Sequence, residues 1–320
     1  MKKNLLVTGG SGFIGVNLLK ELSKLKKYKI TATYFKAKNF YKVNKVKYIK
    51  TDLEKLKNCH KVCKNIDIIV MCAANSSGAA VMDRTPLVHL TPNIRMNLNM
   101  LEAAYSQGVR KFIFISSNTV YPVSNFAMRE TDAKFDFFEK YHVVGWMKRF
   151  SEIVCEIYSK KIKNPMKTII VRPGNLYGPY DKFDPAKAKV IPSLIAKIVN
   201  RQNPINVWGN GKDLKDFLYI DDFCRALIKI INLNTDFNTF NIASGKSITI
   251  KDILKILMKI ENLRNTRIFY DLSKPTMIPK RLISISKIKK QFAYKSLISI
   301  EEGLKRTLNW YKEKKIYDRN

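Results

Sequence analysis

The chain has 320 residues, of which 46% are hydrophobic and 27% are charged. That length can bury one large core or two unequal ones, and the composition is typical of a globular protein rather than a disordered one. The first apolar run, Leu5 to Val7, stops at Thr8, too early for the core of a signal peptide. No apolar run is long enough to span a bilayer, so the sequence predicts a cytoplasmic protein without a membrane partner.

The charge is strongly positive. Lysine and arginine number 59 against 26 acidic residues, which gives a formal net charge of +33. Such a charge attracts polyanions, including nucleic acids. The lysines, however, are spread along the whole chain, and many fall where a helix would face solvent, as at Lys20 and Lys24. A general preference for lysine explains this pattern better than a dedicated surface, so nucleic-acid binding is an unfavoured alternative.

Five scattered cysteines form an odd set, which argues against a disulfide framework. Cys59-His60 and Cys63 lie close enough together to suggest zinc, but no second cluster of ligands follows them. We therefore predict no metal site. The simpler interpretation is a lysine-rich helix whose thiols turn inward.

Short apolar runs alternate with helical patterns through the first half of the chain. Buried strands are predicted at Leu5–Val7, Ile30–Tyr34, Val46–Ile49, Ile66–Met71, Phe112–Ser116 and Thr168–Val171. Helices are predicted between them at Phe13–Lys26, Pro92–Gln107 and Phe137–Lys160. This alternation is typical of a parallel sheet with helices on both faces, so we expect an α/β fold with a Rossmann-type doubly wound sheet.

The pattern changes after Leu176, where prolines divide the chain into short pieces. A helix-and-strand piece at Phe217–Ile231 and Thr239–Ile242 looks like a return to the main sheet. We expect a cofactor-type domain over residues 1–175, rejoined by residues 213–243. A smaller, interleaved C-terminal lobe is expected over residues 176–212 and 244–320.

A glycine-rich segment follows the first strand and begins the first helix. Gly9 permits a tight turn, Gly12 lets the backbone approach a pyrophosphate, and Gly15 allows close packing of helix and strand. The helix then presents free N–H groups near Phe13 and Ile14, at the positive end of its dipole. A glycine pattern alone is weak evidence. Its place between a strand and an amphipathic helix indicates a dinucleotide site.

The second strand indicates which dinucleotide binds. An Asp or Glu at its end would bind the ribose hydroxyls of NAD. Here the segment from Thr31 to Lys38 contains no acid. Lys36 or Lys38 could instead meet a 2′-phosphate. The sequence therefore favours NADP(H), with NAD(H) as the alternative.

Further motifs resemble the extended short-chain dehydrogenase/reductases, in particular the NAD(P)-dependent epimerases and dehydratases of nucleotide sugars. The similar segments are Thr8 to Gly15, Thr51 to Leu53, Ala73-Ala74, Asn93 with Glu102 to Ala104, and Ser116 to Pro122. The resemblance implies that the chain is an enzyme. Besides the glycine segment and Lys36, it implies cofactor contacts from Asp52, Leu53, Ala73, Ala74, Asn93, Ser116, Lys148 and Pro173.

The second half narrows the resemblance to GDP-L-fucose synthases. Arg172 to Phe183, Val190 to Pro192, Val207 to Gly211 and Lys215 to Phe217 are similar to that group. There the C-terminal lobe holds the nucleoside diphosphate. A lysine and an arginine can neutralise a diphosphate and an indole can stack on a base, although Trp208 could also be a core residue. The implied substrate contacts are Asn175, Lys189, Val190, Leu194, Trp208, Lys215 and Arg281.

The catalytic positions are incomplete. The superfamily uses a Tyr and a Lys four residues apart on one helix, with a Ser or Thr hydroxyl bound to the same substrate oxygen. By resemblance the hydroxyl belongs to Ser117 and the lysine is Lys148. The tyrosine position is then Val144, which cannot carry a proton. Tyr141, two helical turns before Lys148, could replace it.

Two alternatives to that replacement stay open. His142 is another candidate, on a less suitable helical face, and Tyr141 could simply pack against Phe137 or Phe138. The resemblance also implies that GDP-L-fucose synthases move ring protons with a Cys and a His. The matching residues here are Thr119, which is a poor base, and Lys189, which could act if desolvation lowered its pKa or could bind phosphate. Double epimerisation is therefore not implied.

We predict an NAD(P)-dependent nucleotide-sugar oxidoreductase or epimerase that acts at C4 of a GDP-linked keto-sugar. The C-terminal lobe would be its nucleotide-sugar-binding lobe. A non-catalytic relative that binds the cofactor and acts as an RNA-binding or sensor protein is the alternative, motivated by Val144 and the net charge. The resemblance also implies a homodimer that pairs through Pro92–Gln107 and Phe137–Lys160.

Overall fold

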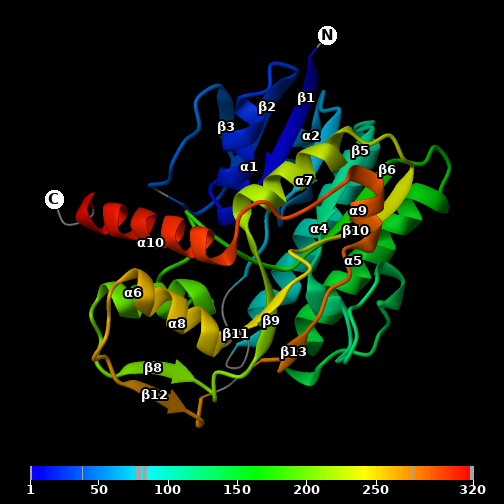
Figure 1. The fold of residues 1–320 in the computed structure, drawn as a ribbon. Coiled ribbons are helices and arrows are strands. Elements are labelled where there is room, and N and C mark those ends of the chain that lie inside the picture. Colours follow the sequence, from blue (N-terminus) through cyan, green and yellow to red (C-terminus); the bar gives the residue numbers. More distant parts are fainter. Residues whose placement is uncertain (1, 38, 77–80, 82–84, 275–276, 318–320) are drawn as a thin grey trace.

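Figure 1 shows the computed structural model of the chain, which describes residues 2–37, 39–76, 81, 85–274 and 277–317. A seven-stranded sheet lies at its centre, in the order β10-β6-β5-β4-β1-β2-β3, with each neighbouring pair parallel. The predicted doubly wound α/β fold is confirmed. The strands are β1 Lys3–Thr8, β2 Tyr28–Tyr34, β3 Val46–Lys50, β4 Ile68–Met71, β5 Lys111–Ile115, β6 Lys167–Pro173 and β10 Phe237–Ile242.

Helices cover both faces of this sheet (Figure 1). On one face α1 (Phe13–Ser23) packs against α7 (Ile220–Asn232). On the other, α4 (Thr91–Ser106) packs against both α2 (Leu56–Cys63) and α5 (His142–Lys160). None of the helices in the described ranges combines the length and apolar character needed to cross a bilayer.

The sheet buries side chains on both of its faces, and β1 illustrates why. Leu5 and Val7 belong to the core under α1 and α7, whereas Leu6 belongs to the core under α2 and α4. Successive side chains of a strand point to opposite faces, so a strand covered on both sides must be apolar throughout. Cys59 and Cys63 of α2 are buried in the second core, as expected for thiols that turn inward.

The C-terminal part builds two smaller sheets and further helices. Strand β9 (Leu214–Tyr219) pairs with β7, β11 and β13, and β8 pairs with β12. The remaining strands are β7 Asn175–Tyr177, β8 Ile205–Trp208, β11 Ser247–Thr249, β12 Ile268–Asp271 and β13 Lys280–Arg281. The helices are α6 Val190–Val199, α8 Ile250–Ile260, α9 Ser286–Phe292 and α10 Ile300–Tyr317.

The segment over residues 213–243 divides between the sheets. Strand β9 lies in a small sheet, whereas α7 covers the main sheet and β10 extends its edge beside β6. The return to the main sheet therefore begins after β9. The division of the whole chain into two lobes stays a prediction.

The predicted helix Phe137–Lys160 is wrong at its start. Residues Glu139–Tyr141 form the short 3-10 helix η4, and α5 begins only at His142. Phe137 lies outside the helix because its ring packs against Gly145, where an added Cβ would stand 2.8 Å from a ring carbon. Three other 3-10 helices are η1 Pro86–His89, η2 Asn118–Val120 and η3 Glu130–Asp132.

Candidate functional site

A cavity of about 1200 Å³ lies along the carboxyl ends of the parallel strands. It begins at the glycine segment after β1 and continues past Ser117 after β5 to Trp208 at the end of β8. Ligands of open α/β sheets bind at this edge. A single drug-sized ligand fills a pocket of roughly 300–1,000 Å³, so this cavity is larger than one such ligand requires.

The glycine segment is shaped for a close approach of backbone. Gly9 has φ +68°, and an added Cβ would stand 2.8 Å from the Cα atom of Ala73. A Cβ on Gly15 would overlap the carbonyl of Gly9. A Cβ on Gly12 would meet just that carbonyl oxygen, at 3.2 Å, so the cavity side of Gly12 is open.

The N-terminus of α1 faces the same space. Gly12 is the N-cap of α1 and has no side chain that could accept a hydrogen bond from the first N–H groups. The first turn contains no acidic residue. Phe13 and Ile14 line the cavity. The free N–H groups and the helix dipole make this end a site for an anion such as a pyrophosphate.

On the side of the glycine segment, the far end of the cavity lies beside β2 and β3. Lys36 lines it, with Nζ 5.4 Å from the ring centroid of Phe35. Asp52 and Leu53 line the same end, where an oxygen of the Asp52 carboxylate accepts the N–H of Glu54 at 3.1 Å. Lys38 lies outside the described residues.

The loop after β4 is held in place by hydrogen bonds. Ala73 donates its N–H to Thr8 Oγ1 at 3.1 Å, and both Ala73 and Ala74 line the cavity. Buried Asn93 donates to the carbonyl of Asn75 at 3.0 Å and accepts its N–H at 2.8 Å. Asn93 therefore fixes the backbone that forms one wall of the site.

Ser117 and Lys148 lie on the wall between the two halves. Ser117 Oγ accepts the N–H of Thr119 at 3.1 Å, and Lys148 Nζ donates to the carbonyl of Ile115 at 2.8 Å. Burial lowers the pKa of Lys148 to about 8. Val144 lines the cavity with them, so an isopropyl group stands where the family resemblance places a phenol.

Tyr141 lines the cavity but not on the helical stripe expected from its spacing. It is the N-cap of α5 rather than a residue two turns into the same helix as Lys148. Its ring lies 6.0 Å from the guanidinium carbon of Arg281 and 6.1 Å from the ring of Phe138. Burial raises the pKa of Tyr141 to about 12, so the phenol keeps its proton at neutral pH.

Ser116 has a partner that the sequence did not reveal. Its Oγ donates to Glu152 at 2.5 Å, and Arg172 donates to the two carboxylate oxygens of Glu152 at 2.8 and 2.7 Å. Burial opposes the charge of Arg172, yet the hydrogen bonds and the charge of Glu152 raise its pKa. Glu152 falls four residues after Lys148, but its partner Arg172 on β6 is distant in sequence.

The other half of the cavity is lined by basic and apolar side chains. Lys189 Nζ lies 5.8 Å from the ring of Phe13, which joins this half to the glycine segment. Trp208 is 38% exposed and therefore not a core residue. Lys215 pairs with Asp213 at 3.2 Å, and Asn175 donates to the carbonyl of Asp216 at 2.9 Å. Val190 and Leu194 of α6 and Pro173 at the end of β6 also line the cavity.

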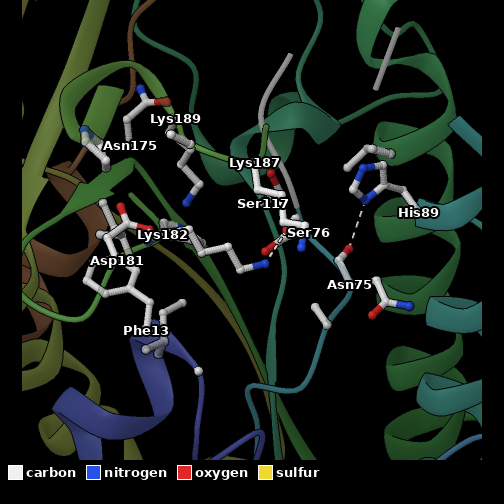
Figure 2. Close-up of a pocket in the computed structure, with 18 of the residues that line it drawn as sticks. Phe13, Asn75, Ser76, His89, Ser117, Asn175, Asp181, Lys182, Lys187 and Lys189 are labelled. Atoms are coloured by element: carbon white, nitrogen blue, oxygen red, sulfur yellow. Dashed lines mark hydrogen bonds between the residues drawn. The ribbon is translucent and has the colours of Figure 1, made fainter. Parts of the chain in front are cut away.

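Asp181 and Lys182 also line the cavity, and the sequence did not single them out as contacts. Figure 2 shows Lys182 extending from the loop after β7 to the carbonyl of Ser76, to which its Nζ donates a hydrogen bond. Asp181 is buried, one of its carboxylate oxygens has no partner, and burial raises its pKa. Short loops after parallel strands bring these residues together.

Two predicted residues do not line the cavity. Gly15 lies beneath Gly9, where its role is packing. Arg281 is buried and donates through Nη1 to the carbonyls of Tyr121 and Pro122 at 2.9 and 3.2 Å. Its Nε and Nη2 have no partner. The contact of Arg281 with the diphosphate therefore stays a prediction.

Comparisons with known proteins agree with this geometry. A sequence model of the NAD dependent epimerase/dehydratase family matches residues 5–243. A dTDP-4-dehydro-6-deoxy-D-allose reductase of a Streptomyces species is 28% identical over 97% of this chain and 96% of its own length. GDP-L-fucose synthase of Escherichia coli strain K12 is 27% identical over 78% of this chain and 81% of its own.

A solved structure extends the comparison to three dimensions. UDP-N-acetylglucosamine 4-epimerase from Methanobrevibacter ruminantium, in complex with UDP-N-acetylmuramic acid, has a TM-score of 0.84 and 26% identity. That comparison covers 98% of this chain and 100% of the other. The similar proteins therefore differ in the base of the nucleotide that their names carry.

Proposed function

The chain belongs to the NAD-dependent epimerase/dehydratase family, and on that basis we propose that it reduces the C4 keto group of a GDP-linked sugar with NADPH. One observation carries the proposal. Ser117 and Lys148 line a single cavity between the N-terminus of α1 and the indole of Trp208. In this arrangement the reacting carbon of the sugar would lie between a dinucleotide at α1 and a nucleoside diphosphate at Trp208.

The residues of the cofactor half fit a dinucleotide phosphate. The open side of Gly12 and the free N–H groups of α1 would hold the pyrophosphate. Lys36 would meet the 2′-phosphate, since β2 ends without an acid. Asp52 and Leu53 would flank the adenosine. When bound, the reduced nicotinamide supplies the hydride.

The residues of the other half of the cavity support a nucleoside diphosphate. The partly exposed indole of Trp208 would stack on the base, and Val190, Leu194 and Lys215 line the same half. Lys189 lies near Phe13 at the junction of the halves, where its ammonium would neutralise the diphosphate. Asn175 would orient the sugar.

The chain's own groups favour reduction over epimerisation at the ring. Ser117 would donate a hydrogen bond to the keto oxygen, and the Lys148 ammonium would hold the nicotinamide ribose. Tyr141 keeps its proton and is one candidate donor to the alkoxide that forms. At the positions that resemble the epimerising pair, Thr119 offers an unpaired hydroxyl, which is a poor base at neutral pH.

The outer face of α5 supports a homodimer. Trp146 stacks on Phe150 with ring centroids 5.3 Å apart and planes 3° apart, and Ile157 continues the stripe. Trp146 and Ile157 are 38% and 42% exposed. Aromatic and aliphatic side chains of this kind form the centres of subunit interfaces. We therefore propose that two chains pair through α5 and α4.

The activity assay uses the purified protein with 4-keto-6-deoxy sugars linked to GDP, dTDP or UDP, each with NADPH and with NADH. We expect NADPH oxidation that depends on the keto-sugar and is fastest with GDP. Lys36→Met should raise KM for NADPH and leave KM for NADH unchanged. Trp208→Ala should raise KM for the sugar with little change in kcat, which marks a binding contact. Absence of turnover with all three sugars would contradict the proposal.

A further inference from the structure

His89 is a buried histidine on the cavity wall with one ring nitrogen unpaired. It ends η1, is 3% exposed and lines the cavity. Its Nε2 is buried and has no hydrogen-bond partner among the residues that the structure describes. Buried polar atoms are nearly always paired, so an unpaired one beside a cavity indicates a ligand or a reaction.

The orientation of the ring is fixed from the other side. Nδ1 lies 3.0 Å from the carbonyl oxygen of Asn75, as Figure 2 shows. A carbonyl accepts hydrogen bonds but donates none, so Nδ1 carries the proton. In the neutral ring Nε2 then offers a lone pair. Asn93 holds Asn75 through its N–H and its carbonyl and also donates to the carbonyl of His89 at 2.7 Å.

The position of His89 relates it to the missing tyrosine. The short helix η1 packs against α5, which carries Val144 and Lys148. Val144, Lys148, Ser117 and His89 all line the same cavity. Figure 2 shows the ring of His89 directed at the carbonyl of Asn75, in the loop that also carries Ser76. His89 can thus supply, from the neighbouring wall of the cavity, the proton that Val144 lacks.

We propose that His89 supplies the proton that Val144 cannot, an inference that rests on the proposed reduction. The bound reduced nicotinamide would supply the hydride that forms the new C–H bond at C4, and the π electrons of the carbonyl would move to its oxygen. A proton carried on Nε2 of His89 would pass to that oxygen, which becomes a hydroxyl. The ring keeps its Nδ1 proton, which it still donates to the carbonyl of Asn75, and Nε2 takes up a new proton from solvent once the product has left.

Other donors on the neighbouring elements are less well placed. Lys148 donates to the carbonyl of Ile115, Tyr141 faces Arg281, and exposed His142 packs edge-on to Phe137. In the N-terminal halves of α4 and α5, Arg95 pairs with Glu54 and Arg149 pairs with Glu152.

The kinetic test compares His89→Gln with Tyr141→Phe. Glutamine can still donate to the Asn75 carbonyl but cannot exchange a proton. We expect kcat to fall by about 100-fold or more in His89→Gln, with KM for the sugar changed by less than about threefold. A larger loss in Tyr141→Phe than in His89→Gln would overturn the inference.

A rescue variant separates proton supply from damage to the fold. His89→Gln combined with Val144→Tyr restores a phenol at the position that the family resemblance assigns to it. Recovery of activity in this double variant, with the melting temperature and the NADPH affinity of all variants matched to the parent, supports the inference. Failure of the double variant to exceed His89→Gln, with the fold intact, contradicts it.

A spectroscopic readout works without turnover. The chain has three histidines, His60, His89 and His142, so ¹⁵N-histidine labelling gives three rings that single His→Gln variants assign. Adding NADP⁺ and an unreactive GDP-sugar should shift the Nε2 resonance of His89 and leave that of His60 unchanged. If the Nε2 resonance does not move although both ligands bind, His89 does not touch the sugar. If the wild-type protein turns over no keto-sugar but shows the shift, the proposed reduction is refuted, while the contact between His89 and the sugar still stands.

Discussion

Glu152 and Arg172 form a buried ion pair in which both carboxylate oxygens accept hydrogen bonds from one guanidinium, at 2.8 and 2.7 Å. Glu152 is fully buried on α5, and Arg172 lies at the end of β6. The pair also holds Ser116, and the remaining guanidinium nitrogen donates to the Tyr121 hydroxyl at 2.9 Å. The helix that carries Lys148 is therefore locked to the strand ends at the cavity.

Breaking this ion pair should lower the free energy of unfolding of the protein. Glu152→Gln leaves the charge of Arg172 buried without its partner, and such a change costs about 3–5 kcal/mol. Urea unfolding measures the free energy. Glu156→Gln is the matched control on the same helix, because Glu156 pairs with Lys160 at the surface and should contribute no more than about 0.5 kcal/mol. Equal losses in the two variants would contradict the distinction.

Substitutions in the glycine segment should affect stability and cofactor binding separately. Gly15→Ala brings a Cβ onto the Gly9 carbonyl, so the melting temperature should fall by several degrees. Gly12→Ala meets just one oxygen, at 3.2 Å, and projects into open space. It should fold with a melting temperature close to that of the parent and bind NADPH at least about tenfold more weakly in a fluorescence titration. Unchanged affinity in Gly12→Ala would mean that the pyrophosphate does not lie there.

Lys148 should make stability depend on pH. Burial lowers its pKa from 10.5 to about 8 in the folded chain. Between these values the unfolded chain binds more protons, so stability rises with pH over that interval, by up to about 3 kcal/mol. Lys148→Met lacks this charge, so its free energy of unfolding should exceed that of the parent most below pH 8, and the difference should vanish near pH 10.5. Chemical unfolding at a series of pH values measures both free energies. A difference that does not change with pH would contradict the burial of the charge.

The stripe on α5 should control the oligomeric state. Trp146→Ala removes an exposed indole that stacks on Phe150. If the stripe is a dimer interface, the variant should dissociate at concentrations at least about tenfold higher than the parent in analytical ultracentrifugation. Phe126→Ala removes another exposed aromatic side chain, at 65% exposure and away from α5, and should leave the association unchanged. A parent protein that is monomeric at all concentrations would refute the interface.

The sequence predicts local features of the site well. The glycine segment depends on one strand, one turn and one helix, so its spacing determines where it lies. The alternation of strands and helices also predicts a parallel sheet, whose strand ends bring residues such as Asp52, Ala73 and Ser117 to one edge. These residues lie where the predicted sheet requires them.

Features that depend on contacts between distant segments could not be predicted. The partner of Glu152 comes from β6, and the start of α5 depends on how Phe137 packs against Gly145. The hydrogen bonds from Arg281 to the backbone carbonyls of Tyr121 and Pro122 likewise join segments that are about 160 residues apart. The unpaired Nε2 of His89 likewise depends on the path of the loop that contains Asn75, which no spacing in the sequence encodes.

The most direct test follows the hydrogen itself. The purified protein is given NADPH that carries deuterium at nicotinamide C4, in both faces in turn, together with the GDP-linked 4-keto-6-deoxy sugar. The proposed reduction predicts that one of the two labelled cofactors transfers its deuterium to C4 of the sugar, which mass spectrometry and proton NMR of the product locate. Tight binding of NADPH with no deuterium in any of the nucleotide sugars would contradict the reduction, and it would favour a non-catalytic protein in which Val144 marks the loss of the reaction.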